Sequence, residues 1–136
     1  MKTEIISTEY YFIKIDTSKN RAYFCVLARW QGIENFSNFL EQWEEVVQKL
    51  ESNFTITSDL RIMPIFSKDI EKLFAQVQEY LVNNGLLHVA EVAALDDISN
   101  LQITRISNRT HLPLNKFATL EEAEKYLDKL VATLKE

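Results

Sequence analysis

Few residues of this sequence combine a reactive type with a suitable position, and the best placed are Asp59, Arg61 and Ser67. The acid and the base directly follow a run of apolar and β-branched residues that starts at Phe54, and Ser67 precedes a helical pattern. If the run forms a central parallel strand, Asp59 and Arg61 lie at its carboxyl end, where open α/β sheets bind ligands. The three residues are therefore our candidates for contact with a partner or ligand.

The same three residues also have a structural interpretation. Asp59 can accept hydrogen bonds from loop amides, Arg61 can pair with a surface carboxylate, and Ser67 can cap the following helix. The N–H groups at the start of that helix could instead hold an anion. The sequence leaves both interpretations open.

Glu91 is a second carboxylate of interest, because it lies within the apolar run of residues 86–94. A buried carboxylate would need a partner, and burial would raise its pKa, as in many general bases. An enzyme that uses Asp59 or Glu91 as a base is therefore one hypothesis. The simpler expectation is that Glu91 lies at an exposed strand end.

Aromatic residues are concentrated near the amino end of the chain, among them Trp30, Phe39 and Trp43. A sheet and one helical stripe would bury most of them in the core. The remainder could line an apolar pocket for a lipid or another small ligand, or form a patch that pairs two copies as a homodimer. The sequence does not separate these alternatives.

No motif of a known catalytic or metal centre accompanies these residues. His88 and His111 have no cysteine or carboxylate at metal-ligand spacing, and the sequence has no glycine-rich phosphate loop and no nucleophile elbow. The single Cys25 lies in an apolar run and is expected in the core. We therefore predict a non-catalytic protein without a metal or cofactor.

The strands that position these residues follow from alternating or continuous apolar patterns. Residues 10–16 and 21–30 are expected to pair as an antiparallel hairpin around the turn at residues 17–20. Further strands are expected at residues 54–59, 86–94 and 112–117.

Four helices are predicted from three- and four-residue spacing and from capping residues. They begin at Asn35, at Ser67, at Asp96 or Asp97, and at Thr119, and the third is expected to end near Arg105. A helix between two consecutive strands makes a parallel βαβ unit. The prediction is one α/β domain of residues 1–136, with a mixed sheet of about five strands, an antiparallel hairpin followed by parallel βαβ units, and about four flanking helices.

Charge and hydropathy exclude several classes of partner. The 136 residues carry a formal net charge of -5 and their basic residues are scattered, so no nucleic-acid surface is expected. No apolar run approaches the ~20 residues of a membrane helix, so no stable membrane insertion is expected. The amino end lacks the features of a signal peptide and the single cysteine has no partner, which predicts a cytoplasmic protein.

The order of these elements resembles that of the STAS-like group. The resemblance rests on the strand that ends in Asp59-Leu60-Arg61, on Asn84-Gly85-Leu86 before an apolar strand, and on the segment that runs from Phe117 through Thr-Leu-Glu-Glu-Ala to Leu127. Members of the group resemble the anti-sigma-factor antagonist of sporulating bacteria and are related to a lipid-binding fold. The resemblance implies a mixed sheet flanked by helices that acts as an interaction or small-ligand module.

The phosphorylated antagonists of that group carry a serine in an Asp-Ser-x-Gly context after the central strand. Here Asp59 is followed by Leu60 and Arg61, and the next serine is Ser67. We therefore expect a regulatory module without the usual phosphoacceptor serine, which binds another protein through Asp59, Arg61 and the helix that starts at Ser67. The alternative is a binder of a lipid or other apolar ligand in a pocket lined by Trp30, Phe39 and Trp43.

Overall fold

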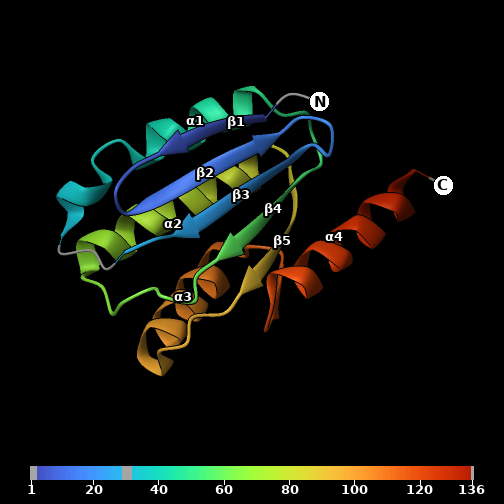
Figure 1. Cartoon of the computed structure of the whole chain (residues 1–136). Coiled ribbons are helices and arrows are strands. Elements are labelled where there is room, and N and C mark those ends of the chain that lie inside the picture. The colour runs from blue at the N-terminus through green and yellow to red at the C-terminus, as the bar shows by residue number, and fades with distance from the viewer. Residues whose placement is uncertain (1–2, 29–31, 136) are drawn as a thin grey trace.

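A single six-stranded sheet organises the chain, in which the strands lie side by side in sequence order (Figure 1). The computed structural model describes residues 3–28 and 32–135. The strands are β1 (Thr3–Ser7), β2 (Tyr11–Asp16), β3 (Arg21–Val26), β4 (Phe54–Asp59), β5 (Leu86–Val92) and β6 (Leu114–Phe117). The helices are the short 3-10 helix η1 (Ile33–Phe36), α1 (Phe39–Gln48), α2 (Lys68–Asn83), α3 (Asp97–Thr110) and α4 (Leu120–Leu134).

The sheet is mixed, as predicted. β1, β2 and β3 pair antiparallel, whereas β3, β4, β5 and β6 run parallel to their neighbours. β4 lies between β3 and β5, and all six of its residues are buried. The expectation that Phe54–Asp59 forms an interior strand is therefore confirmed.

Three helices cover one face of the sheet because each parallel connection moves one strand further in the same direction. Right-handed crossovers of this kind put their helices on the same side. Buried side chains of α1, α2 and α3 accordingly share one core with β2, β3, β4 and β5. α4 follows the last strand and packs on the other face, where Ala123 and Leu127 contact Ala90 and Val92 of β5.

The structure differs from the sequence prediction at several element ends. β1 was not expected; it adds an edge strand to the hairpin and pairs along its whole length with β2. The predicted first helix is divided into η1 and α1, and the third helix continues past Arg105 to Thr110. It ends at His111, which takes the left-handed conformation with φ of 59°. No helix within residues 3–28 and 32–135 is long and apolar enough to cross a bilayer.

Candidate functional site

Asp59 and Arg61 form an ion pair with each other at the carboxyl end of β4. Arg61 donates from Nε to Asp59 Oδ1 at 2.9 Å and from Nη2 to Asp59 Oδ2 at 2.7 Å, and its backbone N–H also bonds to Oδ1 at 3.2 Å. Asp59 is only 7% exposed, whereas the Arg61 side chain is 44% exposed. The structural interpretation thus holds for Asp59, because three of its hydrogen bonds come from Arg61 in the loop that follows it.

The electrostatics of this corner favour the ionised form of the Asp59 carboxyl group. Burial acts to raise the pKa of Asp59, but the Arg61 guanidinium and amide more than offset it and leave that pKa below its usual value. Cys25 Sγ lies 3.8 Å from Asp59 Oδ2. Burial, followed by the Asp59 charge, raises the pKa of the Cys25 thiol to about 11, so the thiol stays protonated at neutral pH.

Ser67 acts as the cap of α2. Its Oγ accepts a hydrogen bond from the Ile70 N–H at 3.4 Å, and Asp69 and Glu71 lie in the first turn, where their charge suits the helix dipole. The predicted cap is therefore confirmed.

Sequence reasoning missed an exposed apolar surface next to the Asp59–Arg61 pair, which we call the aliphatic rim. Its five side chains are exposed by 47–77%, far more than core residues of the same types. Two come from the loop after β4, one from the loop after β5 and two from the start of α3: Ile62, Ile65, Leu95, Ile98 and Leu101. Individually exposed aliphatic residues are common, whereas a large contiguous apolar area marks a contact surface.

Hydrogen bonds hold the segments that carry the aliphatic rim together. The Leu95 N–H donates to the Arg61 carbonyl at 3.1 Å, which joins the two loops. The Ser99 hydroxyl donates to the Met63 carbonyl at 2.9 Å, and the Gln102 amide makes two bonds with the Phe66 backbone. The loop after β4 is therefore fixed against α3, although its aliphatic side chains face outward.

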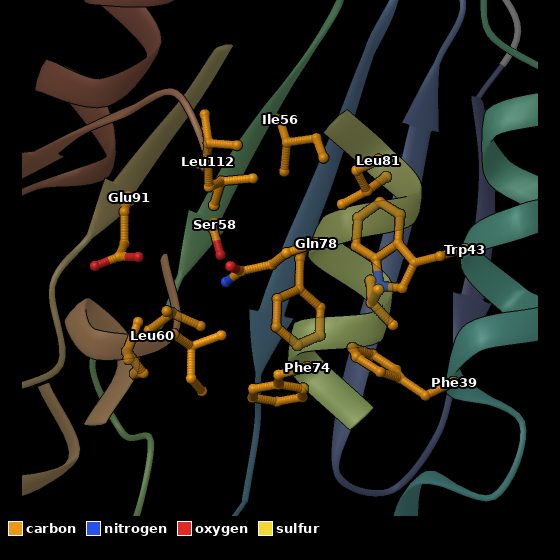
Figure 2. A pocket seen from close by; sticks show the side chains of 15 residues that line it. Phe39, Trp43, Ile56, Ser58, Leu60, Phe74, Gln78, Leu81, Glu91 and Leu112 are labelled. Atoms are coloured by element: carbon orange, nitrogen blue, oxygen red, sulfur yellow. The ribbon is translucent and has the colours of Figure 1, made fainter. Parts of the chain in front are cut away.

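A cavity of about 70 Å³ lies on the opposite side of β4, between the sheet and helices α1, α2 and α3. Phe39 and Trp43, two of the three aromatic residues predicted to line a pocket, both line it. Trp30, the third, lies outside the described residues. Figure 2 shows the rings of Phe39, Trp43 and Phe74 on one side, and the polar groups of Ser58, Gln78 and Glu91 toward the other.

Glu91 is buried, so the expectation of an exposed strand end was wrong. It is 3% exposed, and its position in β5 pairs with Ser58 in β4 and Lys116 in β6. Lys116 Nζ lies 3.4 Å from Glu91 Oε2, yet no described residue makes a hydrogen bond to that oxygen. Burial raises the pKa of Glu91, and the Lys116 charge offsets this only in part.

A buried polar network fixes α4 on the other face, and sequence reasoning also missed it. Arg21 in β3 is 1% exposed and bonds from Nη1 to Asp128 at 2.8 Å and to Glu124 at 3.1 Å. Its Nε donates to Thr55 Oγ1 at 2.9 Å, and Tyr23 donates to Glu124 at 3.0 Å. The members of this network are far apart in sequence, so only the strand register and the packing of α4 on the sheet bring them together.

The histidines contribute to local structure. His88 Nε2 lies 2.8 Å from Asn115 Oδ1, and His111 ends α3. Residues 3–28 and 32–135 contain no group of three or more His, Cys, Asp or Glu side chains that could hold a metal ion. No protein-family model matches the chain, and no curated protein matches it significantly. The resemblance to the STAS-like group stays a prediction.

Proposed function

We propose that this protein is a non-catalytic module that binds another protein through the aliphatic rim. The observation that carries the proposal is the exposure of five large aliphatic side chains on three segments that are hydrogen-bonded together. A rigid surface of this kind loses little conformational entropy on binding. The aliphatic rim lies at the carboxyl ends of β4 and β5, where open α/β sheets offer binding sites.

Charge supports a protein partner over the other classes. The chain is acidic overall, with a net charge of -5, and exposed Asp96 and Asp97 directly follow Leu95 in the aliphatic rim. Nucleic acid and anionic membranes would be repelled by this border. Like charge also opposes a contact between two copies of the chain. The partner that fits is a different protein whose apolar surface is bordered by basic residues.

Arg61 connects the predicted site to the aliphatic rim. Its Nε and Nη2 bind Asp59, its carbonyl accepts from Leu95, and its half-exposed guanidinium lies beside Ile62 in the chain. Asp59 therefore acts as a positioning residue for this loop, and Arg61 is a candidate for direct contact with the partner.

The proposal is tested by quantitative affinity capture from an extract of the source organism. The bait proteins are the wild type, a rim variant Leu95→Asp/Ile98→Asp and a matched control Ile5→Asp/Leu134→Asp. Ile5 and Leu134 have exposures of 61% and 51%, respectively, and lie on β1 and α4, so both variants replace two exposed aliphatic residues with two acids. Surface changes of this kind alter stability by about 0.5 kcal/mol or less each.

We expect one protein that is retained by the wild type and the control and lost with the rim variant. The retained protein is then purified, and its direct binding is measured with the same three baits. Equal retention by all three baits would contradict the proposal. Light scattering of the purified wild type gives a further check, because a dimer that the rim variant dissolves would assign the surface to a second copy instead.

A further inference from the structure

The cavity behind β4 contains a hydrogen-bond donor that the proposed partner surface does not use. Trp43 of α1 lines this cavity and is 2% exposed, and no described residue accepts a hydrogen bond from its indole N–H. Figure 2 shows the indole nitrogen on the inner side of the ring, toward the other lining side chains. Most buried polar groups in proteins have a protein, water or ligand partner. A ligand that accepts one hydrogen bond here would satisfy the indole.

Trp43 determines the group that such a ligand must carry. The indole N–H is a donor only, so its partner must supply a lone pair. A carbonyl oxygen supplies one without adding a donor of its own. An alcohol would add an O–H group, and the rings of Phe24 and Phe39, whose centroids lie 6.1 and 6.4 Å from that of the indole, offer no oxygen to accept it. A carbonyl group is therefore the better match.

The rest of the lining disfavours ions. None of the fifteen residues that the structure describes around the cavity is basic, so a carboxylate would lose its hydration and gain no cation. The buried carboxylate of Glu91 would also repel it. A cation such as an ammonium group has no lone pair for the indole N–H. The ligand that fits is therefore neutral.

The volume limits the size of the ligand. A cavity of ~150 Å³ holds benzene, with six carbon atoms. By proportion, about 70 Å³ holds roughly three or four non-hydrogen atoms. This is too small for the acyl chain of a lipid. All the lining residues are buried except Gln78 and Leu112, which are partly exposed, so a small molecule would enter between α2 and the segment after α3.

We propose that the cavity binds a short, neutral carbonyl compound, whose oxygen accepts a hydrogen bond from Trp43 Nε1 while its alkyl groups contact the surrounding rings. The inference does not depend on the partner surface, because the cavity and the aliphatic rim share no residue.

Acetone is the test ligand, and two molecules of the same shape are its controls. 2-Methylpropene has a CH₂ group in place of the carbonyl oxygen and offers no lone pair, and acetate adds a negative charge. Each is titrated into ¹⁵N-labelled wild-type protein at pH 7.5, with the indole N–H signals as the readout. The chain has two tryptophans, and the signal that is missing from Trp43→Phe is that of Trp43.

We expect acetone to shift the Trp43 indole proton downfield until saturation, with a dissociation constant on the order of millimolar, which is reasonable for so small a ligand. 2-Methylpropene should cause no such downfield shift, and acetate should not bind. Trp43→Phe keeps an aromatic ring but removes the donor. The ratio of the acetone affinity to the 2-methylpropene affinity should therefore fall about fivefold in this variant.

If Trp43→Phe does not fold, a nuclear Overhauser effect between the acetone methyl protons and the Trp43 indole proton of the wild type replaces it. The inference is overturned if acetone causes no saturable shift, which would leave water as the partner of the indole, or if acetate binds as tightly as acetone. It is equally overturned if the folded variant keeps the wild-type affinity ratio or, where the variant does not fold, if the Overhauser effect is absent.

Discussion

Replacing Glu91 with methionine should stabilise the protein at neutral and alkaline pH. Methionine has a similar length, carries no charge and packs well against aromatic rings. Lys116 would keep its bonds to Asn100 and Thr104 and is 29% exposed, so its charge would not be left buried and unpaired. The substitution therefore removes the desolvation cost of the carboxylate without creating a new one.

The size of the gain follows from the position of the pair. Replacing a fully buried ion pair with apolar groups stabilises proteins by up to about 4 kcal/mol. Here Glu91 is buried but Lys116 is partly in water, and the 3.4 Å between Lys116 Nζ and Glu91 Oε2 still gives some attraction between the two charges. We therefore expect the free energy of unfolding to rise by about 1–2 kcal/mol at pH 8.

The gain should depend on pH in a defined direction. Because burial raises the pKa of Glu91 above its ordinary value of 4.5, the folded protein holds more protons than the unfolded chain between the two pKa values. The stability of the wild type relative to Glu91→Met is therefore highest below pH 4.5 and is lost as the pH rises through the folded pKa. The advantage of the variant should accordingly shrink on acidification.

Urea unfolding of the wild type and Glu91→Met between pH 4 and 8, followed by tryptophan fluorescence, measures this difference. Glu121→Met is the matched control, because the Glu121 side chain is 78% exposed and its replacement should change stability by about 0.5 kcal/mol or less. A variant that is less stable than the wild type at pH 8, or a difference that does not change with pH, would refute the account of Glu91 as a buried, incompletely paired carboxylate.

Three further substitutions test other parts of the structure. Arg21→Met should lower the free energy of unfolding by about 2–3 kcal/mol, since it removes three hydrogen bonds but leaves Asp128 and Glu124 partly in water. Hydrogen exchange should accelerate most in α4, and unchanged exchange there would contradict the role of Arg21. Asp59→Asn should lower the free energy of unfolding by about 1–3 kcal/mol at pH 7. Because the folded pKa of Asp59 is lowered, this loss of stability should diminish in urea titrations as the pH falls below ~4, and a loss that does not change with pH would count against the ion pair. Ser67→Ala should cost about 0.5–1 kcal/mol, and Ser67→Asp, which keeps the cap, should restore most of it in thermal unfolding; equal stability of all three proteins would show that the cap contributes nothing.

Much of the fold could be predicted because its signals are local. The apolar run Phe54–Asp59 and the cap at Ser67 each specify their own element, and the position of β4 follows from the helix on either side of it. β1 gives a weaker signal, since it is a short edge strand in which Ile5 is exposed and Ile6 is only partly buried. Its pairing with β2 is a tertiary contact.

The candidate site was predicted only in part because exposure depends on how elements pack. Asp59 and Arg61 were correctly placed at the end of a central strand, but their pairing with each other and the exposure of Leu95 follow from loop conformation. Glu91 was misjudged because its burial depends on tertiary packing: Lys116 of β6 pairs with it and is held by Asn100 and Thr104 of α3. The end of α3 also extends beyond the predicted Arg105 to Thr110. Thr110 and Ser107 both bond to Gln78 of α2, so a contact distant in sequence helps to hold that extension in place.

The most direct test of the proposed function is photo-crosslinking in living cells with a photoreactive amino acid at position 95, in the aliphatic rim. Leu95 is 77% exposed, so the substitution should not disturb the fold. The same amino acid at position 134 on α4 is the control. We predict an adduct with a second, different polypeptide from position 95 and none from position 134. An adduct from position 134 alone, or none from either position, would contradict the assignment of the aliphatic rim as the partner surface.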